Sequence, residues 1–95
     1  MIIFIPTPLR LYVGGDDSVE VNAATITEAL DRLIETHPDL RKHLFSGDGK
    51  LRSFVNLYLN DEDVRYLPAK EQTTVTTSDT LTIIPSIAGG LRTEN

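Results

Sequence analysis

The sequence predicts an α+β protein in which one main helix packs on one face of a mixed sheet of four to five strands. Two observations support this fold class. Short apolar or alternating stretches occur on both sides of a single long amphipathic stretch at residues 26–36. The resulting order is strand, strand, helix, strand, short strand, strand, and the helix supplies the long crossover that parallel pairing requires. We therefore expect the last strand beside the first, in the middle of the sheet.

Length and composition limit the possible functions. The chain has 95 residues, a net charge of −5 and no cysteine. One domain with a single core is expected at this length, and the missing cysteine excludes disulfides, thiolate metal sites and cysteine nucleophiles. The acidic balance argues against nucleic acid as a partner and favours a basic protein surface. No stretch approaches the ~20 apolar residues of a membrane span, so we expect no membrane partner.

The N-terminal third is predicted to form a hairpin. Residues 2–5 are apolar and form the first strand, because Pro6 and the lack of a basic segment argue against a signal peptide and for a cytoplasmic location. The prolines keep residues 6–13 extended, and 14–17 form a turn. Residues 18–22 alternate polar and apolar side chains, as expected for a half-buried strand that returns beside the first.

A capping box marks the start of the main helix. Thr25 stands three residues before Glu28, so its hydroxyl accepts from the Glu28 amide while the Glu28 carboxylate reaches back. Pro38 disfavours helical geometry at the residue before it, so the helix ends near Thr36. The apolar positions fall on one stripe that packs on the sheet. They are Ile26, Ala29, Leu30, Leu33 and Ile34.

A second, shorter helical segment is expected at residues 39–45, with its apolar side chains turned inward. These are Leu40, Leu44 and Phe45. His37 and His43 are the only histidines and are separated by a proline break, so we expect solvent-facing or capping roles and no metal site. Residues 46–50 form a loop.

Residues 52–59 form the longest predicted strand. The alternation assigns Val55, Leu57 and Leu59 to the core face, and Phe54, Asn56 and Tyr58 to the opposite face. On that face Phe54 and Tyr58 either fill a satellite cluster or form a docking surface for a partner.

The last part of the domain contains a turn, a return strand and a final strand. Residues 60–63 form a turn whose acidic side chains point apart, so they are not a cation site. Residues 64–67 return as a short strand, and 68–79 are a polar connection. Residues 80–84 form the last strand, with Leu81 and Ile83 facing inward, and Pro85 ends it because it has no N–H to donate.

Small side chains follow this strand. Residues 88–95 are expected to form a flexible tail, in which Gly89 and Gly90 are followed by a five-residue extension, 91–95. Two successive glycines leave the Gly90 carbonyl unshielded by any nearby Cβ. A catalytic centre on another protein can then approach that carbonyl from either side.

Two blocks resemble a known family. Residues 54–66 read Phe-Val-Asn-Leu-Tyr-Leu-Asn-Asp-Glu-Asp-Val-Arg-Tyr, and residues 79–90 end in Ile-Pro-Ser-Ile-Ala-Gly-Gly. Both resemble the ubiquitin-like sulfur carriers, the MoaD/ThiS group, and are most similar to the CysO-type branch of cysteine biosynthesis. The resemblance runs from Met1 to Gly90 and implies a β-grasp domain over residues 1–87.

The resemblance also implies a chemistry. In this family an E1-like adenylyltransferase uses ATP to activate the terminal glycine carboxylate, here Gly90, which becomes a thiocarboxylate after attack by a sulfur donor. The thiocarboxylate then passes its sulfur to a sulfur-accepting synthase, for cysteine or else for thiamine or molybdopterin. Ala88 and Gly89 would be the slim neck that these partners recognise. The chain is then a protein cosubstrate and not an enzyme, and it binds no cofactor of its own.

The extension after Gly90 departs from the family pattern, because family members usually end at the second glycine. As written, Gly90 is an internal amide that cannot be adenylated. A JAMM-type zinc peptidase that cleaves between Gly90 and Leu91 would remove this obstacle. Otherwise the extension is a remnant of cloning, or the protein is not a carrier.

Two other functions fit the same residues. In the first, Gly90 is joined to lysines of other proteins, as in ubiquitin-like modifiers. In the second, the chain is a non-covalent small subunit of a synthase that docks through Phe54 and Tyr58, with Ile87 as a further contact. The modifier function requires Gly90, whereas non-covalent docking does not.

Overall fold

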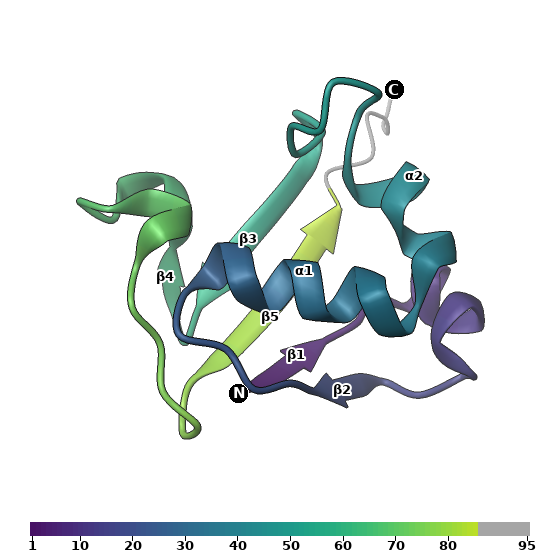
Figure 1. Cartoon of the computed structure of the whole chain (residues 1–95), viewed down its shortest axis with the longest axis horizontal. Coiled ribbons are helices and arrows are strands. Elements are labelled where there is room, and N and C mark those ends of the chain that lie inside the picture. Colours follow the sequence, from purple (N-terminus) through teal and green to yellow (C-terminus); the bar gives the residue numbers. More distant parts are fainter. Residues whose placement is uncertain (86–95) are drawn as a thin grey trace.

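The computed structural model describes residues 1–85, and residues 86–95 lie outside it. At the centre of its five-stranded sheet lies β5 (Thr80–Pro85), between β1 (Ile2–Phe4) and β3 (Val55–Leu59). β5 is parallel to β1 and antiparallel to β3. The last strand therefore lies beside the first, which confirms the predicted topology (Figure 1).

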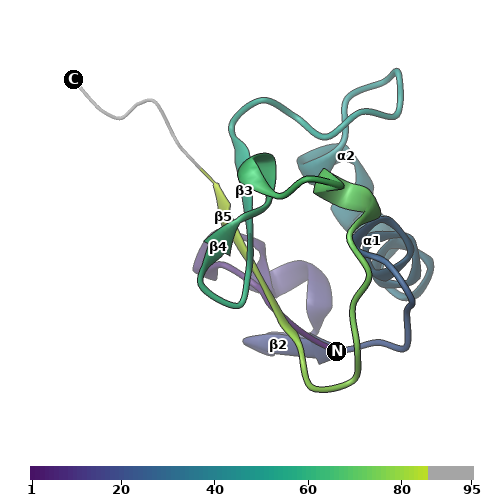
Figure 2. The ribbon, with the colours of Figure 1, turned by 90° about the vertical axis from the view of Figure 1, so that its left-hand side faces the viewer.

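Two short strands form the edges of the sheet. β2 (Ser18–Glu20) pairs antiparallel with β1 and completes the predicted hairpin, although it ends two residues earlier than expected. β4 (Glu62–Asp63) pairs antiparallel with β3 at the other edge. The sheet order is β2-β1-β5-β3-β4, and α1 (Ile26–Thr36) and α2 (Arg41–Leu44) lie on one side of it (Figure 2).

The capping box starts α1 with a small shift from the expected pattern. The Thr25 hydroxyl accepts from the Glu28 amide at 3.2 Å, as predicted. The Glu28 carboxylate accepts from the Ala24 amide at 2.6 Å, one residue before the cap. Both bonds satisfy backbone donors at the helix start that have no partner within the helix.

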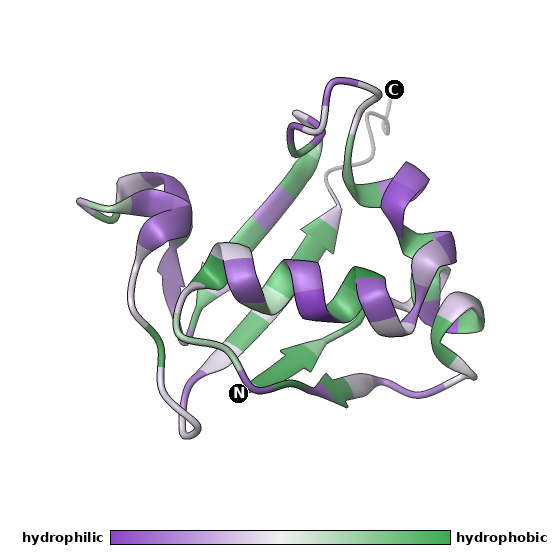
Figure 3. Ribbon diagram, viewed as in Figure 1, coloured by the Kyte–Doolittle hydropathy of each residue, from purple (hydrophilic) through white to green (hydrophobic). Residues whose placement is uncertain are grey.

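The core lies between α1 and the sheet. All five predicted apolar positions of α1 are buried, and Figure 3 shows both hydropathy colours along this helix and the apolar colouring of β1 and β5. The sheet contributes the alternate residues of its three central strands, including Ile3, Leu57, Leu81 and Ile83. The predicted core faces of β3 and β5 are therefore confirmed.

The segment after α1 folds as expected. A 3₁₀ turn, η2 (Pro38–Leu40), leads into α2, and Leu40 and Leu44 are fully buried at 0% exposure. Phe45 is partly buried against the same core. These side chains close the core at the end of α1.

Residues 6–13 are not extended, and this prediction is wrong. Thr7–Val13 form a 3₁₀ helix, η1, which buries Val13. The fixed φ of proline suits the first turn of a helix as well as an extended chain, so the prolines could not decide between the two. The helix ends at Gly14, whose φ of 73° is in the left-handed region that glycine tolerates.

The predicted return strand at 64–67 is also wrong. In the segment that returns after β3, only Glu62–Asp63 pair with that strand, and Val64–Tyr66 form a 3₁₀ turn, η3. The Asp63 carboxylate caps this turn by accepting from the Arg65 amide at 2.9 Å. A side-chain cap of this kind competes with continued strand pairing. A further 3₁₀ turn, η4 (Lys70–Gln72), lies within the polar connection.

The histidines differ from each other. His37 is the C-cap of α1, and its amide donates to the Leu33 carbonyl at 2.9 Å, which confirms a capping role. His43 is not a cap and is half-buried. Its ring stacks on Tyr12 with centroids 4.4 Å apart, and its Nε2 is buried with no hydrogen-bond partner among the described residues. Within residues 1–85, no group of three metal-ligating side chains is present.

A polar clamp joins the turn after β3 to the start of β5. The Asn60 amide group donates to Asp79 at 3.2 Å, and its oxygen accepts from the Thr80 amide at 3.2 Å. The Thr76 amide donates to the other Asp79 oxygen at 2.8 Å. These donors, the Thr76 amide first, hold the pKa of Asp79 below its usual range.

The buried position of Leu81 predicts a large loss of stability on truncation. Leu81 is 0% exposed, whereas Leu11 is 71% exposed. Leu81→Ala should lower the free energy of unfolding by about 2–5 kcal/mol because it leaves a cavity. Leu11→Ala, the control, should stay within about 0.5 kcal/mol of the parent. Urea unfolding measures both, and equal effects would contradict the placement of β5 in the core.

The clamp predicts a stability difference that depends on pH. A lowered native pKa stabilises the fold above the unfolded value of 3.8, and this contribution disappears as pH falls through the native pKa. Asp79→Asn should therefore be less stable than the parent at neutral pH, and the gap should narrow below pH 3.8. Urea unfolding at a series of pH values tests this. A gap of constant size would show that the ionised carboxylate is not what stabilises the clamp.

Candidate functional site

The end of β5 is where the domain leads into the predicted carrier residues. Ile87, Ala88, Gly89, Gly90 and Leu91 all lie outside the described residues. The structure does describe the strand that precedes them. β5 runs to Pro85, one residue further than predicted, and Pro85 stands opposite Val55 of β3.

Pairing on both sides holds β5 in place. Ile83 of β5 is 2% exposed and lies opposite Leu57 of β3. On the other side, three successive residues of β1 pair with the first three residues of β5. A strand held by two ladders and by its own buried side chains gives the following segment a fixed starting point.

An apolar patch lies on the sheet face away from α1. We call Phe4, Tyr58 and Ile84 the outer patch. Phe4 and Tyr58 both stand opposite Thr82 of β5, and Ile84 lies two residues further along that strand. Phe4 and Ile84 are each 44% exposed. Exposed apolar side chains gathered on one sheet face are typical of a protein contact surface.

A groove lies on the helix side of the β5 end. It has a volume of about 280 Å³ and is bordered by η1, α2, the segment before β3, and β5. We call it the exit groove. Its apolar lining is Pro8, Leu9, Leu44, Phe54, Val55, Ile83 and Pro85, and its polar lining is Lys42, His43 and Arg52.

The structure separates the two aromatics that the sequence placed on one surface. Tyr58 lies on β3 in the outer patch, as predicted. Phe54 precedes β3, in a turn where the Val55 amide donates to the Arg52 carbonyl at 3.0 Å, and it lines the exit groove. Strand alternation does not extend to a residue in a turn. The prediction that Phe54 and Tyr58 share one face of the sheet is therefore wrong.

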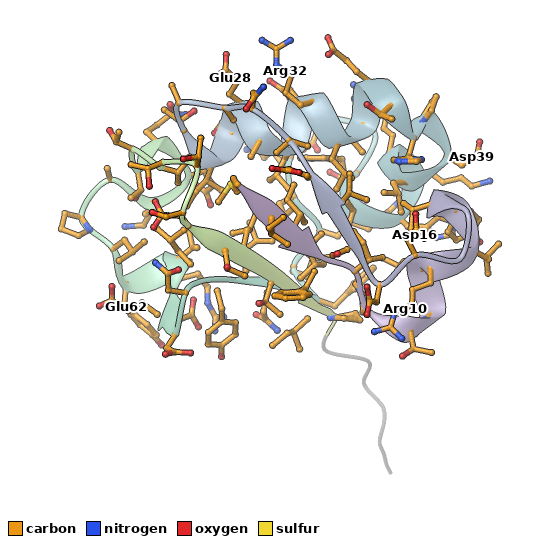
Figure 4. The ribbon with its side chains drawn as sticks, turned by 90° about the horizontal axis from the view of Figure 1, so that it is seen from below. Arg10, Asp16, Glu28, Arg32, Asp39 and Glu62 are labelled. Carbon is orange, nitrogen blue, oxygen red and sulfur yellow. The ribbon has the colours of Figure 1, made fainter. Side chains whose placement is uncertain are left out.

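The sequence prediction did not include several residues at this site. Phe4 and Ile84 were detectable from strand alternation, because each directly follows an inward-facing residue, Ile3 or Ile83. Arg10 was not. Its Nε donates to the Ile5 carbonyl at 3.0 Å, and it lines a shallow depression with Ile84 and Pro85 (Figure 4). Only the fold of η1 brings Arg10 to the end of β5.

The described residues offer contact surfaces at this site. No polar or charged residue within 1–85 is fully buried. No helix of that part of the chain is long and apolar enough to cross a membrane. Gly90, on which the predicted chemistry takes place, lies outside the described residues.

Comparison with known proteins identifies the family. The ThiS family matches residues 3–90, a span that includes the Gly-Gly. The chain belongs to the ThiS family. The predicted membership in the ubiquitin-like sulfur carriers is confirmed.

Curated relatives of this ThiS-family chain carry two kinds of name. The sulfur carrier protein CysO of Mycobacterium tuberculosis is 38% identical over 90 residues, which is 93% of this chain and 96% of that protein. The small archaeal modifier protein 1 of Haloferax volcanii is 32% identical over 81 residues, or 82% of this chain and 87% of that protein. The chain is thus similar both to proteins named as sulfur carriers and to a protein named as a modifier.

Solved structures confirm the fold. The CysO chain in the Amycolatopsis orientalis BexX/CysO complex matches with a TM-score of 0.82 at 42% identity, and covers 94% of this chain and 98% of that one. Haloferax volcanii small archaeal modifier protein 1 matches with a TM-score of 0.80 at 29% identity, over 95% of this chain and 98% of that one. The ThiS-family chain has the β-grasp fold that was predicted.

Proposed function

We propose that the chain is a sulfur carrier whose Gly90 carries sulfur as a thiocarboxylate. The observation that carries this proposal is the family match through residue 90, together with a central strand that ends five residues before Gly90. The 38% identity to a sulfur carrier protein supports the same function. Because the chain has no cysteine, it has no side-chain thiol that could hold the sulfur.

The chemistry begins with a free Gly90 carboxylate. An oxygen of this carboxylate attacks the α-phosphorus of ATP and releases pyrophosphate, which gives an acyl adenylate. A sulfur donor then attacks the glycyl carbonyl, and AMP leaves with the electron pair of the broken C–O bond. With hydrosulfide as the donor, loss of the S–H proton leaves the thiocarboxylate directly. With a persulfide R–S–SH as the donor, the acyl disulfide that forms first is cleaved by a second thiol, which leaves as a disulfide with the donor's sulfur and releases the thiocarboxylate. The E1-like adenylyltransferase supplies the ATP site, and the chain supplies an unhindered carbonyl.

Chain length sets how deep Gly90 reaches into a partner. Gly90 is five residues beyond Pro85. At ~3.3–3.6 Å per residue, a fully extended segment of this length spans at most about 18 Å. The partner's reaction centre must therefore lie within that distance of the β5 end, and its surface contacts the outer patch or the exit groove at the same time.

The extension 91–95 makes processing part of the proposal. A peptidase of the JAMM zinc type would hydrolyse the bond between Gly90 and Leu91 and free the carboxylate. The synthase that accepts the sulfur is then most simply one for cysteine, as the CysO relatives indicate, with thiamine and molybdopterin synthesis as alternatives.

Mass spectrometry tests the carrier function. The chain ending at Gly90, incubated with the adenylyltransferase of the same genome, ATP and a sulfur donor, should gain the mass that replacement of one oxygen by sulfur produces. The full chain ending at Asn95 should remain unchanged, because it has no free Gly90 carboxylate. If the trimmed chain also remains unchanged, the carrier function is rejected.

The outer patch supplies a second test. Ile84→Ser should raise the KM for the chain in adenylation about tenfold, since the loss of one apolar anchor costs roughly 1–2 kcal/mol of binding. The kcat should change little. Leu11→Ser, which alters an exposed leucine of η1, is the matched control and should leave both constants unchanged. Thermal unfolding of both variants checks that the fold is kept, and an unaltered KM for Ile84→Ser would remove the outer patch from the interface.

A protein modifier is the second candidate, favoured by the 32% identity to small archaeal modifier protein 1. In this function the Gly90 acyl group forms an amide with a lysine of another protein. Denaturing gels of cell extracts probed for this chain should then show a ladder of covalent conjugates. A pure carrier gives only the free chain.

A further inference from the structure

The charge around the end of β5 is opposite to the charge of the chain as a whole. The chain carries 14 acidic and nine basic residues. Yet the described residues that line the two depressions beside Pro85 include cations and no carboxylate. The exit groove is lined by Lys42 and Arg52, and the depression on the other side by Arg10.

These cations have no ionic partner within the described residues. Among residues 1–85, the ion pairs join Arg32 to Glu28 and Glu35, and Arg65 to Asp63. Lys42, Arg52 and Arg10 take part in none of them. Arg52 is instead fixed in place, because its Nε donates to the Lys42 carbonyl at 2.9 Å. This bond holds the Arg52 side chain against the backbone of α2, and both Arg52 and Lys42 line the exit groove.

A further polar atom of the groove has no partner. His43 lines the exit groove beside Lys42, and its Nε2 is buried with no hydrogen-bond partner among residues 1–85. Most buried polar atoms in proteins are paired, so each exception needs a reason. Here the exception lies in the same groove as the unpaired cations.

The size of the groove limits what it can hold. Its volume of about 280 Å³ is slightly below the ~300–1,000 Å³ of typical small-molecule sites. One apolar side chain fits this space better than a cofactor does. Carboxylates next to that side chain would meet the Lys42 ammonium and the Arg52 guanidinium, which suits carboxylate geometry.

We propose that the exit groove binds an acidic segment of a partner protein. One apolar side chain of that segment sits against Phe54, Ile83 and Pro85, and its neighbouring carboxylates pair with Lys42 and Arg52. The inference rests on the proposed function only in that a partner protein receives the C-terminal end of the chain. The net charge of the chain favours a basic partner surface, and the exit groove adds one place where that partner presents acidic side chains.

NMR titration of the full ¹⁵N-labelled chain tests the groove directly. The probe is a blocked pentapeptide with a central phenylalanine and two acidic residues on each side, and its control carries asparagine and glutamine in their place. The acidic peptide should shift the backbone amides of Lys42, Arg52 and Phe54, and added salt should weaken the effect. The neutral peptide should shift them far less. Equal shifts with both peptides, or none, would overturn the proposal.

A charge-matched pair of variants separates the groove from net charge. Lys42→Glu/Arg52→Glu should weaken the acidic peptide about tenfold or more, because attraction becomes repulsion. The control Lys50→Glu/Lys70→Glu makes the same change in net charge at two lysines that do not line the groove. It should alter the affinity for the acidic peptide less than about twofold, because salt screens charges at a distance. Comparable losses in both variants would show non-specific attraction and reject the site.

Two other occupants give distinct results. If the groove amides shift when the free chain is diluted, the groove is filled by a second copy. If they shift when residues 91–95 are removed, it is filled by the chain's own end. Either result replaces the acidic partner. The titration does not involve Gly90 chemistry, so a failed adenylation with an occupied groove rejects the carrier function alone.

Discussion

The pairing of β5 between β1 and β3 is the constraint on which the rest of the structure depends. It joins the two ends of the domain in parallel and leaves β2 and β4 as the edges. The buried side chains of β5 then face α1, so one strand sets both the sheet order and the position of the core. The same pairing fixes where the chain leaves the sheet, next to the outer patch and the exit groove. Fold and function therefore meet in a single element.

Elements that carry a signal in their own sequence, such as a helix cap or strand alternation, were predicted correctly. The Thr25–Glu28 capping box and Pro38 gave both ends of α1, and alternation gave the core faces of β3 and β5. The prediction of an extended chain at residues 6–13 was wrong because proline fits a 3₁₀ turn as readily as an extended chain. The predicted strand at 64–67 does not form, because β4 ends at Asp63, whose side chain caps the 3₁₀ turn that follows. A hydrophobic pattern does not reveal a side-chain cap of this kind.

The site was predictable only where it lies in consecutive residues. The Gly-Gly and its family context stand in one stretch, so the sequence alone supports the prediction that the chemistry occurs at Gly90, which lies outside the described residues. The exit groove is different, because Pro8, Lys42, Arg52 and Pro85 come from four separate segments. Nothing in their spacing along the chain links them. The cations at the β5 end, which have no ionic partner within residues 1–85, are likewise not apparent from a net charge of −5.

The parallel arrangement of β1 and β5 also has a mechanical consequence. A pulling force applied to the C-terminal end of the chain, for example by an unfolding ATPase, would act along the axis of β5, between β1 and β3. The ladder hydrogen bonds on both sides would then bear the force together in shear, whereas a strand at the edge of a sheet can be peeled away bond by bond. Extraction under force is governed by the barrier to unfolding, and shared loading raises that barrier. The strand that presents the chain's end to other proteins is therefore also the strand placed to resist traction on it.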